Sequence, residues 1–405
     1  MSKTDFRGEQ LKNARLLRGM TITALAEKTG ISKQSISLYE NDDNKPESPR
    51  TVALAAALNV PVSFFFSTDV YRAETPATYF RSLVSVPKLS RISQSLKLEY
   101  VAKMYEALLE YIDFPVLNLP DIEYSGMYRL NDPDSENLMF RELEAVSTKV
   151  RDYWNLGDGP IEDLQYILEF NGIIVTGFDT TEEDIDAFSQ RTILKNDEVC
   201  FIAVDQGKKP EGRIRFDMAH ELAHLLIHPW SEDIDLLSKE EFKLRETEAN
   251  IFASAFLLPR KTFGRDISSY PTDIEYYLFL KKKWKTSIQA MMYRARQLGI
   301  ITGNQFQYMM RQVSKRGWRK SEPGDTPYIL GDNIFQGAID LLLEGNYLSI
   351  EGILKLFTDY GIALYPNEIE SLLHIREGTL IPVDSKPKIV HLRTPQHESE
   401  DADEQ

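Results

Sequence analysis

The chain has 405 residues, which is too long for one typical domain and predicts about two to four domains. Its composition, 42% hydrophobic and 27% charged, is ordinary for a folded soluble protein. The polar N-terminus does not resemble a secretory signal, and the most apolar stretch, 52–66, is interrupted by Asn59 and Pro61, which excludes a membrane span. Cys200 is the single cysteine, so no internal disulfide can form. These features predict a cytoplasmic protein without a membrane partner.

The net charge of −15 is unevenly distributed along the chain. Residues 281–320 contain eleven lysines and arginines and no acidic residue, so the rest of the chain is strongly acidic. Residues 391–405 include the run HESEDADEQ and are expected to form a disordered acidic tail.

The first 66 residues predict a series of short helices in a helix-turn-helix layout. Thr21 is placed to cap a helix that ends at Gly30, and Ser32 is placed to cap the next helix. In such a layout the second helix enters the major groove of DNA, where its early side chains meet base edges. The polar candidates for these contacts are Lys33, Gln34, Ser35 and Ser37. The alternative from the pattern alone is a small helical bundle with a solvated polar face.

The run LKNARLLRGMTITALAEKTGISKQSISLYEN resembles the phage-repressor-like (XRE/Cro) helix-turn-helix family, and the likeness covers about residues 8–66. One departure is Ile22 and Thr23, where that family often has glutamine. The resemblance implies binding to double-stranded operator DNA. Residues 1–70 carry nine basic and eight acidic residues, so their attraction to phosphate is weak. We therefore expect tight binding to need a homodimer or another partner.

The middle of the chain is predicted to begin with a linker and to continue with short strands. Residues 71–136 read as a linker that includes a helix over 93–112. Strands are predicted at 172–178 and 199–204, because both runs are rich in β-branched residues. The edge of a small sheet could receive an extended peptide, although most sheet edges are only structural.

The run AHELAHLLIH, residues 219–228, holds three of the chain's six histidines. His220 and His224 are four residues apart, so on a helix they share one face and can present both imidazoles to one ion. Glu221 lies one step round the helix and can reach a metal-bound water without being a ligand. This is the H-E-x-x-H arrangement, in which zinc lowers the pKa of the water and the glutamate takes its proton. Because most chance matches lack a third ligand, the third ligand is the test of this interpretation.

The third ligand is predicted within residues 243–259, which read as a helix ending before a proline. Glu248 falls on the apolar side of this helix, where an unpaired carboxylate is unfavourable. We therefore expect Glu248 to bind the metal, and Glu246, at the edge of that side, is the second choice. His228 directly precedes a proline, so it is expected to cap the helix or to pack rather than to bind. Two histidines and one glutamate leave the fourth zinc position open for water.

The segments RIRFDMAHELAHLLIH and ETEANIFASAFLLP together resemble the ImmA/IrrE family of metallo-endopeptidases, and the likeness extends over about residues 137–325. The resemblance implies Zn²⁺ as the cofactor, with Mn²⁺ as an alternative. It implies that His220, His224 and Glu248 bind the metal and that Glu221 is the catalytic base. Family members of this kind cut repressor-type DNA-binding proteins, and many carry an N-terminal XRE-type domain. A repressor- or antitoxin-like protein is therefore the expected substrate.

The basic residues 281–320 lie in a second helix-turn-helix-like pattern, in which Ser287 is placed to cap a helix ending at Gly299. Aromatic residues among the positive charges suit a nucleic acid or an acidic partner. The alternative is a basic face that is neutralised by the chain's own excess of acid. For the oxyanion stabiliser there are three unranked candidates, Arg213, Arg215 and Tyr293. The isolated His374 and His391 are not expected to be metal ligands.

These features predict a multidomain, mainly α protein that includes one α+β zincin-like domain. The expected parts are a helix-turn-helix domain 1–70, a helical linker 71–136, a metallopeptidase domain 137–270, a basic helical segment 271–325, a helical C-terminal region 326–390 and an acidic tail 391–405. The expected function is that of a DNA-binding transcriptional regulator whose zinc endopeptidase activity relieves repression. The alternative is a non-proteolytic XRE-type regulator or antitoxin whose zinc domain senses a partner or a metal.

The double substitution Lys33→Ala and Gln34→Ala is expected to abolish selectivity for the operator, because both side chains lie early in the predicted recognition helix. Gel-shift titration against operator and scrambled DNA measures this selectivity. An unchanged ratio of the two affinities would discard the proposed recognition helix.

Overall fold

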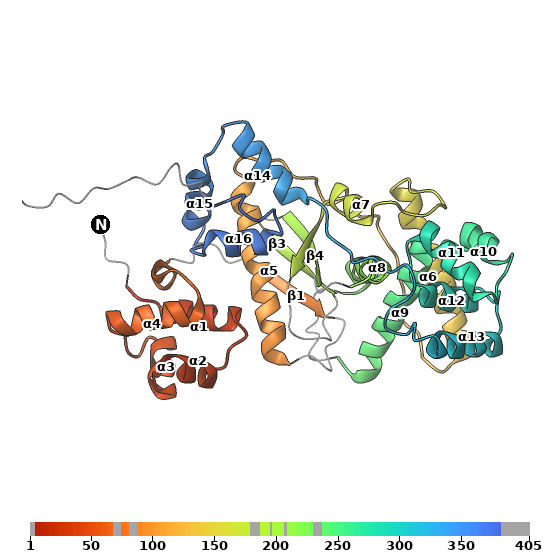
Figure 1. The fold of residues 1–405 in the computed structure, drawn as a ribbon, viewed down its shortest axis with the longest axis horizontal. Helices are drawn as coiled ribbons and strands as arrows, with labels where there is room; N and C mark the ends of the chain where they lie inside the picture. Colours follow the sequence, from red (N-terminus) through yellow and green to blue (C-terminus); the bar gives the residue numbers. More distant parts are fainter. Residues whose placement is uncertain are drawn as a thin grey trace, which may run out of the picture.

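The computed structural model describes residues 5–67, 74–80, 87–178, 187–194, 197–205, 209–229 and 237–381. The molecule is elongated, with the N-terminal helices at one end, a small sheet near the middle and a second group of helices at the other end (Figure 1). Its mainly helical content with one small sheet confirms the expected fold class. In the described ranges, every helix is too short or too polar to cross a membrane.

The N-terminal bundle has the predicted helix-turn-helix layout. Its elements are α1 (Gly8–Leu17), α2 (Ile22–Thr29), α3 (Lys33–Glu40), α4 (Ser48–Leu58) and the 3₁₀ helix η1 (Val62–Phe66). Thr21 caps α2 by accepting a hydrogen bond from the third N–H of that turn, and Ser32 caps α3 in the same way. Gly30 lies between them with a φ of 71°, a conformation in which a side chain would be strained. The caps therefore set both helix boundaries at the turn.

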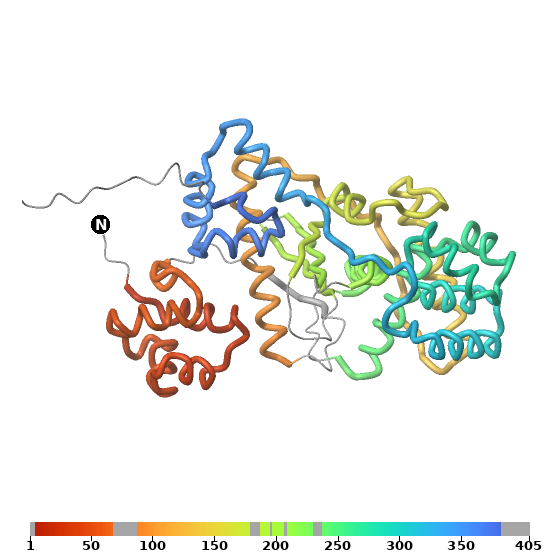
Figure 2. Tube along the Cα trace, viewed as in Figure 1, coloured from red at the N-terminus to blue at the C-terminus, as the bar shows by residue number. Residues whose placement is uncertain are grey.

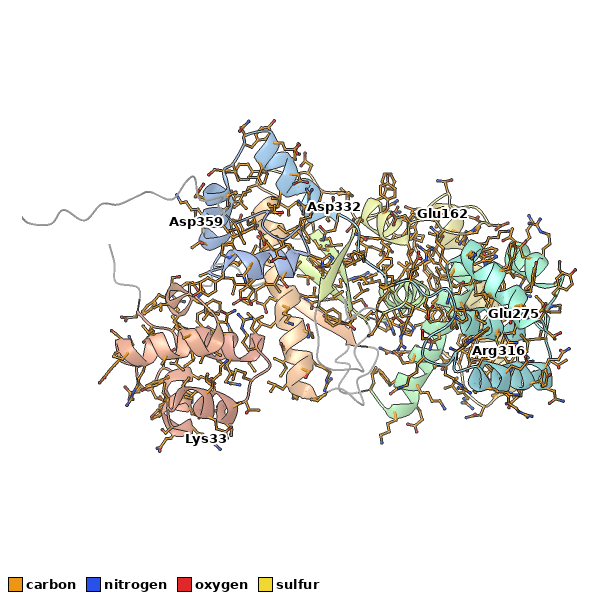
Figure 3. The ribbon with its side chains drawn as sticks, in the orientation of Figure 1. Lys33, Glu162, Glu275, Arg316, Asp332 and Asp359 are labelled. Atoms are coloured by element: carbon orange, nitrogen blue, oxygen red, sulfur yellow. The ribbon has the colours of Figure 1, made fainter. Side chains whose placement is uncertain are left out.

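A buried ion pair joins α1 to the end of α3. Arg15 Nε donates to Glu40 Oε1 at 2.6 Å, and Arg15 Nη2 donates to Glu40 Oε2 at 2.8 Å. Two parallel hydrogen bonds of this kind define the relative orientation of the two helices. The exposed start of α3 is left on the outside of the bundle, where Figure 3 shows Lys33 pointing away from the body.

The sheet has four strands in the order β1-β3-β4-β2. The strands are β1 (Glu74–Phe80), β2 (Ile173–Phe178), β3 (Ala187–Leu194) and β4 (Asp197–Asp205). β2 runs parallel to β4, whereas the other two pairs are antiparallel. The predicted strands correspond to β2 and β4. β1 was not expected, because Pro76 interrupts its sequence; it lies at the sheet edge, where proline is tolerated, and its register shifts between Glu74 and Ala77.

The two faces of the sheet belong to two different hydrophobic cores. Along β4, Phe201 and Ala203 join the core that includes the N-terminal bundle, whereas Cys200, Ile202 and Val204 join the other. The first core also contains α5 (Lys88–Leu108) and the C-terminal helices α14 (Ile334–Glu344), α15 (Ile350–Asp359) and α16 (Pro366–Leu373).

The second core contains the helices that surround the histidine motif, and α8 packs directly on β3 and β4. Its helices are α6 (Pro133–Tyr153), α7 (Leu164–Phe170), α8 (Glu211–Ile227), α9 (Lys239–Leu257), α10 (Arg260–Ile267), α11 (Ile274–Trp284), α12 (Ile288–Gln297) and α13 (Gly303–Lys315). Ser287 caps α12, as the sequence predicts.

The C-terminal helices return to the N-terminal part of the chain. The guanidinium of Arg18, at the end of α1, forms a two-pronged ion pair with Glu368 of α16. Thr176 Oγ1 of β2 donates to the carbonyl of Leu372 at 3.1 Å, which joins the end of α16 to the sheet. Through α16, the helix-turn-helix bundle is therefore connected to the sheet.

Gly8→Ala is expected to destabilise the N-terminal bundle by about 1–3 kcal/mol, because a methyl group there would lie 2.1 Å from the carbonyl oxygen of Tyr39. Hydrogen exchange of the amides in α1–α4 measures the loss. The matched control is Gly303→Ala, where an added methyl meets no atom within 4 Å and no loss is expected. Equal protection in both variants would contradict the packing of α1 on α3.

Candidate metal centre

The candidate site forms where α8 packs against α9. α8 carries the H-E-x-x-H motif on its buried side, and His220, Glu221 and His224 have 1% exposure or less. α9 begins with a capping box at Ser238, which sets its first turn. Because both helices are buried along this contact, each polar side chain between them needs a partner.

Three side chains present donor atoms to one point. The Nε2 atoms of His220 and His224 lie 3.1 Å apart, His220 Nε2 lies 3.4 Å from Glu246 Oε2, and His224 Nε2 lies 3.4 Å from Glu246 Oε1. Two donors bonded at about 2.0–2.1 Å to one tetrahedral zinc lie about 3.3 Å from each other. The spacing of the two Nε2 atoms therefore fits a single small divalent cation, and the Glu246 carboxylate faces both imidazoles. Two imidazoles with one carboxylate form a donor set that suits zinc.

Hydrogen bonds on the far side of each ring orient the two imidazoles so that their Nε2 atoms face each other and Glu246. His220 Nδ1 lies 3.1 Å from Asn250 Oδ1, an oxygen that would accept a hydrogen bond from a proton on Nδ1. His224 Nδ1 lies 2.8 Å from His228 Nδ1, and His228 Nε2 lies 3.0 Å from Glu248 Oε2. If His228 donates from Nε2 to the carboxylate, its Nδ1 accepts from His224, and the lone pair of His224 Nε2 then faces the metal point.

The carboxylate that faces the two Nε2 atoms belongs to Glu246, whereas the sequence analysis preferred Glu248 as the third ligand. Glu248 is buried, as expected, but its oxygens contact His228 and the hydroxyl of Tyr124, which donates at 2.7 Å. Glu246, the second choice, contacts both Nε2 atoms instead. The helical pattern identified a buried acid correctly, but it could not identify which neighbour that acid meets. His228 caps α8 and packs against Glu248, as expected.

The environments of the two glutamates differ electrostatically. Burial, the largest influence, would raise the pKa of Glu246, but hydrogen bonds with His220 and His224 outweigh it and bring the pKa to about 2. Burial raises the pKa of Glu248 to about 7, against the opposing effect of the Tyr124 hydrogen bond. Burial also lowers the pKa of His228, and the charges of His224 and Arg245 reinforce that effect. A neutral His228 is the form that can connect Glu248 to His224.

Glu221 faces the sheet from the motif helix. Its Oε2 accepts a hydrogen bond of 2.6 Å from Ser189 Oγ, and its donor atoms lie within 4.8 Å of those of the two motif histidines. Strand alternation places Ser189 on the face of β3 that α8 covers. Sequence reasoning did not single out Ser189, Tyr124 or Asn250. These residues come close to the site only in the folded structure, so their spacing along the chain could not identify them.

Two of the three oxyanion candidates lie near a cavity beside the site. Arg213 and Tyr293 line a space of about 660 Å³ that also touches Asn250. Arg215 is buried and donates to the carbonyls of Ile161 and Glu162, so it stabilises a turn and does not face this cavity. His374 ends α16, far along the chain from the motif, and His391 lies outside the described residues.

Several cations of the basic segment 281–320 have acidic partners from elsewhere in the chain. The ion pairs are Lys281 with Glu322 and Asp325, Lys283 with Asp266, Lys285 with Glu162, Arg294 with Glu144 and Arg316 with Glu275. Figure 3 shows Arg316 and Glu275 at the outer end of the molecule. This pairing favours the alternative in which the chain's own acid neutralises the basic face.

Comparison with known families identifies two domains in the chain. Residues 11–65 match the helix-turn-helix family, and residues 172–296 match the M78 peptidase family, described as the IrrE N-terminal-like domain. The second match contains the H-E-x-x-H motif, Glu246 and Glu248.

Curated relatives resemble the N-terminal part. The HTH-type transcriptional regulator SutR of Escherichia coli (strain K12) is 35% identical over 74 residues, which is 18% of this chain and 40% of the relative. Uncharacterized HTH-type regulators of Sinorhizobium medicae (strain WSM419) and Rhizobium meliloti (strain 1021) are each 39% identical over 59 residues, covering 15% of this chain and 42% of the relative. The chain thus spans about two-fifths of the length of these relatives.

Glu246→Gln is expected to weaken Zn²⁺ binding by more than about 100-fold, because it removes a charged donor at the metal point. Glu248→Gln, the matched change on the same helix, is expected to weaken binding by about 10-fold to 100-fold, because it disturbs only the support of His224. Competition titration with a zinc-binding dye measures both affinities. A larger loss for Glu248→Gln would restore the assignment made from the sequence.

Proposed function

Because the chain carries a helix-turn-helix domain and an IrrE N-terminal-like peptidase domain, we propose that it is a DNA-binding transcriptional regulator with metal-dependent endopeptidase activity. The proposed substrate is a repressor- or antitoxin-type protein, whose cleavage relieves repression. The observation that carries the proposal is the approach of two imidazole nitrogens and one carboxylate to a single point inside the peptidase domain.

His220, His224 and Glu246 would hold the metal, with Zn²⁺ as the first choice and Mn²⁺ as the alternative. A divalent ion bound there supplies Lewis-acid chemistry, which acidifies water and polarises a peptide carbonyl. Asn250 and His228 orient the two imidazoles, and Glu248 with Tyr124 holds His228 in place.

Glu221 is the proposed general base. Its carboxylate lies beside the two histidines, and the hydrogen bond from Ser189 holds one of its oxygens. The carboxylate would take a proton from the attacking water and deliver it to the nitrogen of the leaving amine. Arg213 and Tyr293, which line the adjacent cavity, are the proposed donors to the developing oxyanion.

The helix-turn-helix domain would bring this activity to an operator. The early residues of α3 are polar and lie at its outer surface, which suits contact with base edges in a major groove. Since the domain is nearly neutral, two copies on neighbouring half-sites would supply phosphate contacts that one copy lacks. The proposed setting is the cytoplasm, where DNA and repressor proteins are both accessible.

Glu221→Gln is expected to lower the cleavage rate about 10²-fold to 10⁴-fold while leaving the affinity for DNA unchanged, because only proton transfer is removed. The full chain is incubated with Zn²⁺ or Mn²⁺ and the purified product of an adjacent repressor-like gene, and fragments are measured by mass spectrometry. Glu240→Gln, at an exposed position in the first turn of α9, is the matched control and should cleave as the wild type does.

Cleavage by the wild type but not by Glu221→Gln supports the peptidase. If neither protein cleaves while both shift the promoter DNA, the non-proteolytic regulator is the correct interpretation.

A further inference from the structure

A cavity of about 310 Å³ lies at the place where the helix-turn-helix bundle meets the rest of the molecule. It is lined from four directions: by the end of α1 and the residue after α4, by α5, by the ends of β2 and β3, and by α16. Figure 2 shows the N-terminal helices in red, α5 in orange and the C-terminal helices in blue around this region. Its volume falls at the lower end of the range of about 300–1,000 Å³ that small-molecule sites occupy.

The inner wall of the cavity is apolar and partly aromatic. Leu98 and Val101 of α5 face Phe178 and Phe188 from the strands, and all four are buried. The two phenylalanine rings have centroids 5.0 Å apart and are tilted by 57°. Rings arranged in this way offer both a face and an edge to a planar ligand.

A single buried amide interrupts this apolar wall. Gln94 of α5 is 4% exposed, and its Oε1 has no hydrogen-bond partner among the described residues. Buried polar atoms in native proteins are nearly always satisfied, so an orphaned acceptor that lines a cavity calls for a partner inside that cavity. A hydrogen-bond donor on a bound molecule would satisfy it.

The rim does not demand a charged ligand. Arg18 and Glu368 face each other across it in a two-pronged ion pair, so each neutralises the other. The remaining lining residues include Lys97 of α5, a half-buried cation that already has an interaction within the protein, and Asn59 and Ser371, which are neutral and exposed. The chemistry of the wall and rim therefore selects a molecule that is uncharged, planar and largely apolar, with at least one N–H or O–H donor.

We propose that this cavity is a binding site for a small neutral aromatic molecule that donates a hydrogen bond to Gln94 Oε1. A molecule held there contacts the helix-turn-helix bundle, α5 and α16 together, so it bridges the DNA-binding domain and the body of the protein. The proposal is independent of the metal centre, which lies on the opposite face of the sheet.

The test uses indole and indene as probes, because they share one shape but only indole has an N–H donor. Dissociation constants for the full chain are measured by ligand-observed NMR. Wild type is expected to bind indole about tenfold or more tightly than indene, since a buried acceptor left unpaired penalises the probe that lacks a donor. Gln94→Leu is expected to lose this preference and to bind indene at least as well as indole.

Two further variants separate this site from non-specific binding and from misfolding. Ser371→Trp places a bulky side chain at the rim and should weaken binding of both probes, whereas Ser269→Trp, at an exposed serine away from the cavity, should not. Circular dichroism melting checks that Gln94→Leu remains folded, as expected when an unsatisfied buried amide is replaced by an apolar group. The proposal is overturned if wild type binds neither probe, binds both equally, or keeps its preference in Gln94→Leu.

Discussion

The contact between α8 and α9 is the constraint on which the candidate site depends. It buries the imidazoles of His220, His224 and His228 and the carboxylate of Glu248 in an apolar environment, where each must be satisfied by a partner. The hydrogen-bond chain from Tyr124 through Glu248 and His228 meets this requirement on one side of His224. What remains is the approach of the two Nε2 atoms to each other and to the carboxylate of Glu246, an arrangement that a divalent cation would stabilise.

Local chemistry made much of this molecule predictable from its sequence. The caps at Thr21 and Ser32, with Gly30 between them, define the helix-turn-helix because their effect is confined to one helical turn. The i, i+4 spacing of His220 and His224 is equally local. The carboxylate ligand was harder to predict. Helical periodicity shows that Glu248 is buried, but it cannot show that Glu248 is hydrogen-bonded to His228 and Tyr124.

Features that depend on contacts between distant parts of the chain could not be predicted from the sequence, because no local pattern specifies such contacts. β1 contains a proline and lacks a strong alternating pattern, so its place in the sheet depends on β3, which is distant along the chain. The return of α14–α16 to the N-terminal core depends on the ion pair between Arg18 and Glu368 and on packing against α5. This return makes α16 a direct connection between the helix-turn-helix bundle and β2. The sheet then separates that connection from the metal centre, which packs on its other face.

The most direct test of the proposed metal centre is an anomalous difference map, at the zinc absorption edge, from crystals of the Zn²⁺-loaded chain. We expect one peak within about 2.0–2.2 Å of His220 Nε2, His224 Nε2 and a Glu246 oxygen, with Glu248 still hydrogen-bonded to His228. A map without a peak between these side chains, or with the metal bound by Glu248 in place of Glu246, would contradict the account.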